Sequence, residues 1–350
     1  MLKTKSGKRI DWSIFIPVLL LLAIGVFVLN SLSFLTASYL LFVALGIFAF
    51  VFFVNIDFEV LSIFSTIFYI SSIFFLLAPI FIGTVTRGTT RWISVGSYTI
   101  QPAEIVRPLL LVFFATTLVN SKKNLPHLTR GILLFLLPTF LILIQPSLGV
   151  TILTTAGFIG VLLASHFPRK YYFIGIFLAC LLLPIGWNLL ADYQKQRIFT
   201  FFMPGSDPQG VGYNSIQSMI SVGSGKIFGR GLGRGIGTQL SFLPERQTDF
   251  IFASISEELG LVGAGLVLLI TFFLLFRLVK IIETSRDWVG RAYVAGFFLA
   301  FFGQVVIHVG MNIGILPITG VPYPLLSAGG SSLIATLAGL GIVASVSRST

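Results

Sequence analysis

Charged residues are scarce in this chain: Asp, Glu, Lys and Arg make up 10% of its 350 residues, and only 12 residues are acidic. Soluble domains carry about a quarter charged residues, so the composition excludes an ordinary soluble domain. A single cysteine, Cys180, excludes a disulfide framework and a cysteine metal site. Hydrophobic residues make up 55% of the chain and the mean hydropathy is +0.98, which predicts a polytopic membrane protein.

Apolar runs long enough to cross a membrane fill most of the sequence. A helix needs about 20 apolar residues to cross a hydrocarbon layer about 30 Å thick. The sequence therefore predicts an all-α polytopic membrane protein of about ten transmembrane helices, in a single domain that covers residues 1–350. The expected spans are 12–31, 35–55, 58–82, 103–120, 129–145, 148–166, 170–190, 253–282, 288–313 and 327–346.

The distribution of basic residues predicts how the spans are oriented. With ten spans, 14 of the 23 Lys and Arg residues fall in the termini and in loops on one side. Because Lys and Arg are enriched in cytoplasmic loops, we expect both termini in the cytoplasm. The basic residues are scattered among the spans, so no nucleic-acid partner is expected.

Two segments on the opposite side stand apart from the spans. Residues 83–100 form a polar stretch that contains Arg91 and Trp92. Trp92 fits an interfacial anchor or a stacking surface for a sugar, and both alternatives stay open. Residues 191–248 form one long loop between the seventh and eighth spans, with aromatic and aliphatic residues throughout. We expect an ordered extracytoplasmic loop that lies on the membrane.

The long loop carries positive charge only in its second half. No acid occurs between Pro208 and Pro244, and Lys226, Arg230 and Arg234 recur every four residues in G-S-G-K-I-F-G-R-G-L-G-R-G-I-G. Glycines let backbone amides approach a ligand, and cations beside free amides favour phosphate. The alternative is a flexible loop or one that binds anionic headgroups.

Three carboxylates, Asp249, Glu257 and Glu258, open the eighth span in T-D-F-I-F-A-S-I-S-E-E-L-G. A carboxylate at a bilayer centre costs about 2.5–3.5 kcal/mol, and acids in spans usually mark a site. Asp249 fits a general base, or else a cap for the helix N-terminus. Glu257 or Glu258 could instead pair with Arg residues and hold helices together.

Polar residues also open the fourth span and precede the last. In Q-P-A-E-I-V-R-P, Glu104 and Arg107 share a helix face and suit catalysis or a structural ion pair, and Pro108 predicts a kink. Residues 317–332 hold three prolines and three glycines, which predicts irregular backbone that lines a cavity or a tight reversal. His308 has no metal-ligand spacing around it and suits a helix–helix hydrogen bond.

Five motifs together resemble one family. They are R-W-I-S-V-G-S-Y-T-I-Q-P-A-E-I-V-R, Q-P-S-L-G-V, Q-S-M-I-S-V-G-S-G-K-I-F-G-R-G-L-G, F-L-P-E-R-Q-T-D-F-I-F-A-S-I-S-E-E-L-G and N-I-G-I-L-P-I-T-G-V-P-Y-P-L-L-S-A-G-G-S-S. Their order resembles the SEDS proteins (shape, elongation, division and sporulation), and the RodA branch more than the FtsW branch. Two positions depart from the family pattern: Ser147 occupies the place of an acidic residue, and Arg107 occupies the place of a lysine.

The resemblance implies a peptidoglycan glycosyltransferase. Such enzymes polymerise lipid II, with the growing glycan on undecaprenyl pyrophosphate, at the outer face of the bacterial cytoplasmic membrane. Their partner is a class B penicillin-binding protein, a transpeptidase. By resemblance Asp249 is the catalytic base of an inverting single displacement. The substrate-binding residues expected from the resemblance and the motifs are Arg91, Trp92, Gln101, Glu104, Arg107, Lys226, Arg230, Arg234, Glu257 and Ser327.

The sequence predicts no metal ligands, and a divalent cation such as Mg or Mn stays open as a cofactor. Two functions of other classes compete with the enzyme. One is a transporter that moves lipid II between leaflets without chemistry, which charged cavities and broken helices also suit. The other is a non-catalytic scaffold for a class B penicillin-binding protein. Surrounding membrane lipids are expected contacts in all three cases.

Overall fold

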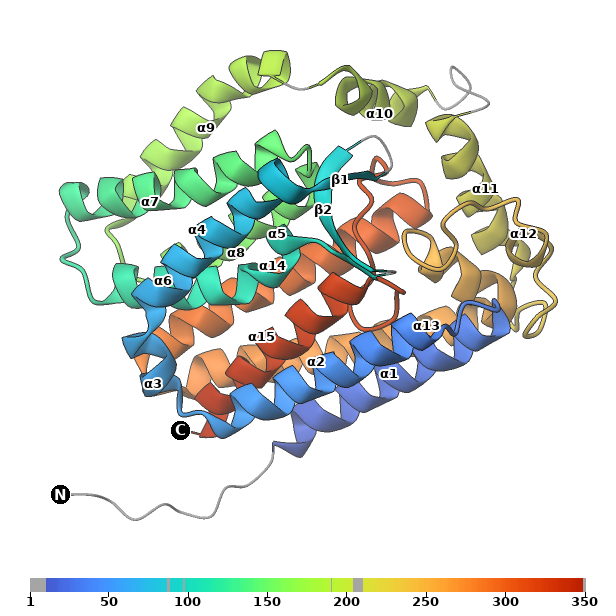
Figure 1. Cartoon of the computed structure of the whole chain (residues 1–350), viewed down its shortest axis with the longest axis horizontal. Coiled ribbons are helices and arrows are strands. Elements are labelled where there is room, and N and C mark those ends of the chain that lie inside the picture. The colour runs from blue at the N-terminus through green and yellow to red at the C-terminus, as the bar shows by residue number, and fades with distance from the viewer. Residues whose placement is uncertain (1–10, 87–88, 97, 190, 204–209, 349–350) are drawn as a thin grey trace.

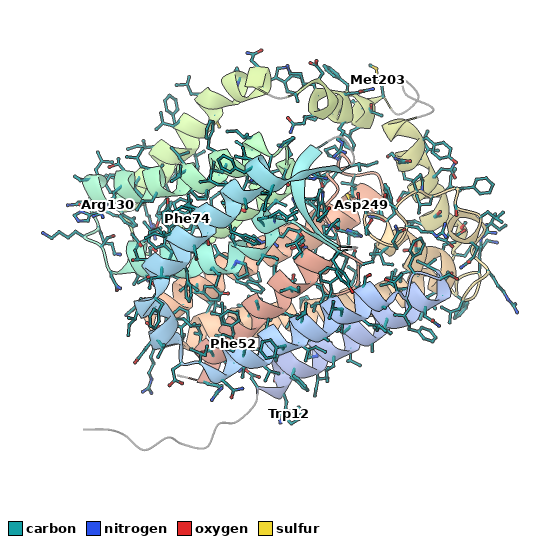
Figure 2. The ribbon with its side chains drawn as sticks, in the orientation of Figure 1. Trp12, Phe52, Phe74, Arg130, Met203 and Asp249 are labelled. Atoms are coloured by element: carbon teal, nitrogen blue, oxygen red, sulfur yellow. The ribbon has the colours of Figure 1, made fainter. Side chains whose placement is uncertain are left out.

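The computed structural model describes residues 11–86, 89–96, 98–189, 191–203 and 210–348. Most helices run along one common direction, and the start of α1 at Trp12 and the end of α15 at Arg348 lie at one end of the bundle (Figure 1). We call this the termini end. The opposite end, where α12 lies, is called the loop end. Asp249 lies in the half of the molecule toward the loop end (Figure 2).

Helices account for nearly all of the regular structure. They are α1 (Trp12–Ser31), α2 (Ala37–Asn55), α3 (Phe58–Ile63), α4 (Ser65–Ile82), α5 (Pro102–Ile105), α6 (Arg107–Val119), α7 (Leu125–Ile144), α8 (Leu148–Ala164), α9 (Arg169–Leu189), α10 (Asp192–Phe202), α11 (Val211–Ser224), α12 (Ile236–Gln239), α13 (Ile251–Thr284), α14 (Trp288–Asn312) and α15 (Gly330–Arg348).

Helices occur at all ten expected spans, although with differences in length. Seven described helices, α1, α2, α4, α7, α13, α14 and α15, are long and apolar enough to cross a membrane, and α6 and α8 are shorter apolar helices. The expected span 58–82 is divided into α3 and α4, and the span 103–120 into α5 and α6. Pro108 lies in the first turn of α6, which explains the second division because proline fits there and not in a helix interior.

The polar stretch 83–100 forms a small antiparallel sheet that the sequence did not predict. Its strands are β1 (Thr84–Thr86), β2 (Thr89–Val95) and β3 (Tyr98–Ile100), in the order β1-β2-β3. Ile93 pairs with Ile100 and Val95 with Tyr98. The sheet lies beside the end of α4, where it carries Arg91 and Trp92 into the interior of the loop end.

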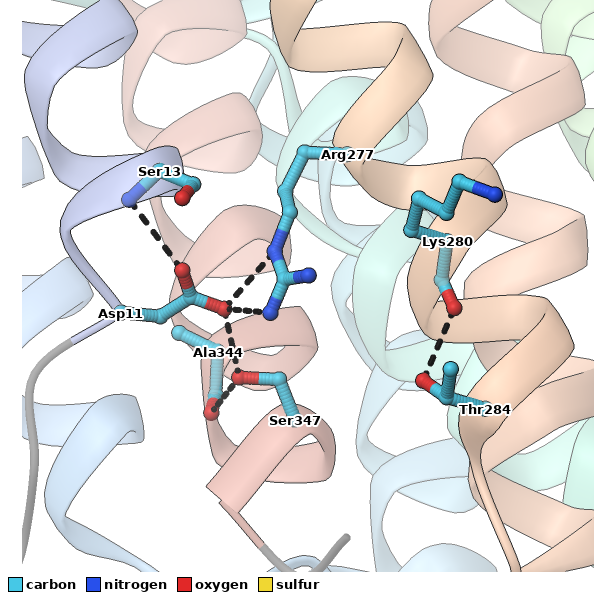
Figure 3. Close-up of polar contacts among 7 residues, drawn as sticks. All are labelled: Asp11, Ser13, Arg277, Lys280, Thr284, Ala344 and Ser347. Atoms are coloured by element: carbon cyan, nitrogen blue, oxygen red, sulfur yellow. Dashed lines mark hydrogen bonds and ion pairs between the residues drawn. The ribbon is translucent and has the colours of Figure 1, made fainter.

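Helices α1 and α13 are tied together at both ends. At the termini end Asp11 accepts from Arg277 at 2.6 Å and from Ser347 at 3.1 Å (Figure 3). At the loop end Ser31 Oγ donates to Glu258 Oε2 at 2.7 Å. The 20 residues of α1 rise about 30 Å, which equals the thickness of the hydrocarbon layer. The two ties therefore lie about one hydrocarbon thickness apart, one at each end of α1.

Helix α13 is interrupted at Gly260, whose φ is 68° and ψ is −165°. Residues 226–231 insert at this point and take over the hydrogen bonds that a continuous helix would make. Lys226 O and Ile227 O accept from Leu261 N and Val262 N at 2.9 and 3.1 Å. Arg230 N and Gly231 N donate to Glu257 O and Glu258 O at 2.9 and 3.0 Å.

Glycines make this insertion sterically feasible. A Cβ at Gly260 would lie 2.3 Å from Gly229 N, and a Cβ at Gly229 would lie 2.2 Å from Glu258 O. The sequence suggested that the glycines of this loop let amides approach a ligand. At Gly229 and Gly260 they instead let the loop backbone approach the backbone of α13.

Replacing Gly260 with Ala should lower the apparent Tm of the purified protein. The backbone conformation at Gly260 is essentially reserved for glycine, and a strained residue costs about 1–3 kcal/mol before the clash with Gly229 is counted. The matched control is Gly265→Ala in the same helix, where a Cβ meets nothing within 4 Å. Because Ala is the better helix former, this control should keep or raise Tm. Equal Tm values for the two variants would contradict the insertion.

Candidate functional site

A polar cavity opens at the loop end among five segments that are distant in sequence. Its empty volume is about 540 Å³, including the part open to solvent. The lining residues come from β2, from α5 and the residue before it, from the start of α8, from the turn before α13 and from the loop between α14 and α15. They are Arg91, Trp92, Gln101, Glu104, Ser147, Gly149, Val150, Thr248, Asp249, Thr319, Gly320, Pro322 and Gly329.

Asp249 is half-buried in the turn that precedes α13. The helix begins at Ile251 with Phe250 as its N-cap, so the alternative in which Asp249 caps the helix does not hold. A Cβ added at Gly320, whose φ is 69°, would lie 3.4 Å from Asp249 Oδ2. Gly320 therefore lets the backbone of the cavity wall pass close to the carboxylate.

Asn312, at the end of α14, performs the capping that Asp249 does not. Its side chain is fully buried. Its Oδ1 accepts from Ala253 N at 3.0 Å, and its Nδ2 donates to Asp249 O at 3.0 Å and to His308 O at 2.8 Å. One carboxamide thus satisfies a free amide of α13 and fixes the main chain of Asp249 to α14.

Ser327 holds the residue before Asp249. It was expected to bind substrate, but its side chain is only 2% exposed and it does not line the described cavity. Its Oγ donates to Thr248 O and accepts from Tyr323 N, both at 2.8 Å. Ala328 N donates to Gln247 O at 2.8 Å. Ser327 is therefore a positioning residue for the turn that carries Asp249.

Arg91, Trp92, Gln101 and Glu104 are brought into the cavity as the sequence suggested. The Arg91 guanidinium lies 5.9 Å from the centre of the Trp92 ring. Trp92 Nε1 is buried without a hydrogen-bond partner among the described residues. An aromatic ring, a cation and two carboxylates in one cavity suit a sugar that carries a phosphate group.

Gln101 and Ser147 form a second polar element of the wall. Gln101 Nε2 donates to Ser147 Oγ at 3.1 Å, and Gln101 N donates to Ser331 Oγ at 2.8 Å. Ser147 is one of the two positions at which the chain departs from the family pattern. Here its hydroxyl accepts a bond that a carboxylate could also accept, so the cavity wall keeps an oxygen at this place without a charge.

Arg107 does not reach this cavity. Its side chain is only 5% exposed, and its Nη2 donates to Gln304 Oε1 at 3.2 Å. The expected pair with Glu104 is not among the ion pairs found within the described residues. Gln304 in turn donates to Pro322 O at 2.9 Å and Ser332 Oγ at 3.0 Å. Arg107 therefore belongs to a buried network that joins α6 to α14 and α15.

The cations of the loop and Glu257 also lie outside the cavity lining. Lys226, Arg230 and Arg234 are exposed on the loop beside α13. Glu257, only 1% exposed, accepts from Gly237 N and Thr238 N at 2.9 Å. The two glutamates were suggested as partners of arginines. They instead bind groups of the glycine-rich loop, because Glu258 accepts from Gly233 N at 3.2 Å and Gln239 Nε2 at 2.9 Å.

Comparison with known proteins identifies the family of this chain. Residues 11–350 match the cell cycle protein family of FtsW, RodA and SpoVE. The chain belongs to this family. It is 40% identical over 282 residues to the peptidoglycan glycosyltransferase MrdB of Escherichia coli K12, which covers 79% of this chain and 76% of MrdB. It is 35% identical over 357 residues to the stage V sporulation protein E of Bacillus subtilis, covering 97% of both.

Solved structures of family members share the fold. A chain from a peptidoglycan synthase complex that coordinates polymerization and crosslinking has a TM-score of 0.82 and 28% identity, covering 97% of this chain and 98% of that chain. The rod shape determining protein RodA of Thermus thermophilus has a TM-score of 0.72 and 25% identity, covering 97% of both chains. The family expected from the motifs is confirmed.

Replacing Asn312 with Leu should loosen the turn that carries Asp249. The variant removes three buried hydrogen bonds and leaves Ala253 N and Asp249 O without their side-chain partner, which costs about 1–3 kcal/mol for each unsatisfied group. Hydrogen–deuterium exchange of the peptide 245–255 should therefore accelerate.

The control is Asn55→Leu, which removes an exposed carboxamide bonded to Val51 O at 2.8 Å. Exchange of the peptide 245–255 should not change in this control. If exchange is equally slow in both variants, Asn312 does not hold the turn.

Proposed function

We propose that this chain is a peptidoglycan glycosyltransferase that polymerises lipid II into glycan strands during cell elongation. The observation that carries the proposal is the cavity that holds Asp249 with Arg91, Trp92 and Glu104 at one end of a membrane bundle. The names of the relatives support the enzyme class, since MrdB is a peptidoglycan glycosyltransferase.

Asp249 acts as the general base of a single displacement. Its carboxylate takes the proton from the 4-hydroxyl of the acceptor sugar, and that oxygen attacks the anomeric carbon of the donor. The bond from that carbon to the pyrophosphate breaks, and undecaprenyl pyrophosphate leaves with the electron pair. Attack from the face opposite the leaving group inverts the anomeric centre. General base catalysis contributes about 10²–10⁴ in rate.

The other lining residues bind the sugars and stabilise the charge of the leaving pyrophosphate. Arg91 supplies a positive charge for the pyrophosphate as it leaves, and electrostatic stabilisation of this kind is often the largest contribution to catalysis. Trp92 offers a ring against which a sugar face can stack. Gln101 and Ser147 offer hydrogen-bonding groups for sugar hydroxyls. Glu104 is the second carboxylate of the cavity and would bind a sugar hydroxyl or amide.

A divalent cation, Mg or Mn, is a proposed cofactor. In the described part of the chain no cluster of three His, Cys, Asp or Glu side chains that could hold a metal is found. Asp249 and Glu104 supply the carboxylate oxygens that such ions prefer, so these two side chains would hold the ion together with the substrate. When bound, the ion would neutralise charge on the pyrophosphate.

The proposed setting is the bacterial cytoplasmic membrane, with both termini in the cytoplasm and the loop end outside. The basic residues of the termini and of the loops at the termini end support this orientation. The proposed partner is a class B penicillin-binding protein, which would crosslink the strands. Similarity to a chain from a peptidoglycan synthase complex supports an assembly of this kind.

Transport of lipid II and a scaffold role remain the competing functions. A transporter needs a pathway open to both leaflets, whereas the described cavity lies at the loop end only. A scaffold does not need a carboxylate in the cavity. The three functions therefore differ in what they predict for Asp249.

Replacing Asp249 with Asn should lower glycan polymerisation by about 10²–10⁴-fold, because the amide cannot accept the acceptor's proton. The measurement is glycan formed from lipid II by the protein reconstituted with its partner in vesicles. The control is Asp57→Asn, which changes an exposed acid at the termini end and should leave the rate unchanged.

The same vesicles distinguish the competing functions. A transporter would change the distribution of lipid II between leaflets and form no glycan. A scaffold would leave polymerisation intact in the Asp249→Asn variant. Polymerisation at the wild-type rate in this variant would therefore refute the assignment of the base.

A further inference from the structure

The loop that inserts at Gly260 leaves an exposed surface of apolar and cationic side chains, which we call the cationic tip: Lys226, Ile227, Phe228, Arg230, Leu232 and Arg234. Phe228 is 82% exposed and Ile227 is 57% exposed. All three cations are exposed. Exposed apolar side chains of this size beside cations mark an interaction surface.

The depth of the tip follows from its bonds to α13. The tie of Ser31 to Glu258 and the tie of Asp11 to Arg277 lie at the two ends of α1, about one hydrocarbon thickness apart, so we take them as the two boundaries of the layer. The 17 residues of α13 that follow the break, from Leu261 to Arg277, rise about 25 Å, close to the thickness of the hydrocarbon layer.

Ile227 lies just inside the first of these boundaries. Lys226 O and Ile227 O accept from Leu261 N and Val262 N, which follow the break at Gly260 and begin the part of α13 that runs to the termini end. Leu261 and Val262 are themselves 68% and 55% exposed, as expected of residues that face lipid. The backbone of Lys226 and Ile227 therefore lies beside the first turn of the lipid-facing part of α13, and the backbone of Arg230, whose N–H donates to Glu257 O, lies beside the turn before the break.

The charge of the tip is not neutralised within the described protein. The loop holds no acid between Pro208 and Pro244. The nearest carboxylates, those of Glu257 and Glu258, are buried and bind backbone amides and side chains of the loop and α1. No ion pair among the described residues involves Lys226, Arg230 or Arg234, and Arg230 Nε donates to a hydroxyl, Ser224 Oγ, at 3.2 Å.

We propose that the cationic tip docks on anionic phospholipids of the leaflet at the loop end. Phe228 and Ile227 insert at the boundary of the acyl chains, and Lys226, Arg230 and Arg234 bind headgroup phosphates. Aromatic and aliphatic residues flanked by Lys and Arg bind membranes in this way. Each cation near an anionic surface strengthens binding by about fivefold.

Docking would steady the part of the loop that leads into the turn of Asp249. The same cations could in principle serve the pyrophosphate of the substrate. The exposed position of the tip, away from the residues that line the cavity, favours the bilayer. The inference depends on the membrane bundle and not on the proposed chemistry.

Spin labels on cysteine test the depth of the tip. The background is Cys180→Ser, which removes the single exposed cysteine. Labels are placed one at a time by Phe228→Cys, Leu261→Cys and Thr284→Cys in the full chain reconstituted in bilayers. Leu261 is the hydrocarbon reference, and Thr284, the last residue of α13 beyond Arg277, is the aqueous reference. Accessibility to oxygen and to a water-soluble nickel complex gives the depth.

We expect the label at Phe228 to match the one at Leu261. A match to Thr284 would overturn the proposal. This comparison leaves all three cations intact, so it stands even if a charge variant fails to fold.

The second measurement identifies the ligand of the cations. Accessibility of the label at Phe228 to the nickel complex is compared in phosphatidylcholine, in phosphatidylcholine with phosphatidylglycerol, and in phosphatidylcholine with undecaprenyl pyrophosphate. We expect phosphatidylglycerol to lower it, and the triple variant K226Q/R230Q/R234Q to lose that shift. If only undecaprenyl pyrophosphate lowers it, the cations serve the substrate and the proposal fails.

Discussion

The order of the loop end depends on the exchange of backbone hydrogen bonds at Gly260. A helix broken inside a membrane protein leaves amides and carbonyls that must find partners, because no water can satisfy them there. Residues 226–231 supply those partners. The loop is therefore part of the structure of α13, and the carboxylates of Glu257 and Glu258 hold the next turns of the loop through buried hydrogen bonds.

The turn that carries Asp249 is fixed mainly through its main chain. Asn312, Ser327 and the amide of Ala328 bind three successive carbonyls, those of Asp249, Thr248 and Gln247. Buried polar groups are costly unless they are hydrogen-bonded. Hydrogen bonds from α14 and from the loop before α15 satisfy these carbonyls. They hold the turn so that the Asp249 side chain lines the cavity. A base placed in this way needs little reorganisation before it accepts a proton.

Some of the residues expected in the cavity line it and others do not, and the difference has a physical reason. Asp249, Gln101 and Glu104 meet in the cavity because each lies at or just before the start of a helix at the loop end, and β2 brings Arg91 and Trp92 to the same place. Glu257, Arg107 and Ser327 are also polar, but their side chains are buried against neighbouring segments and do not line the cavity. Periodicity places a residue on a helix face but cannot say which neighbour packs against that face. No role in the site was assigned to Asn312 and Gly320 from the sequence, because their contacts with the turn and the start of α13 join residues 59 to 71 positions apart.

The membrane class, the approximate positions of the spans, the break at Pro108 and the family could all be predicted from the sequence. The length of an apolar run, the position of a proline and the order of motifs depend on residues that are close in the chain, so the sequence is enough to recognise them. The sheet of β1, β2 and β3, the insertion of the loop at Gly260 and the set of polar residues that line the cavity emerge from the packing of the whole chain. These features depend on hydrogen bonds between distant segments, whose partners become defined only when the helices pack.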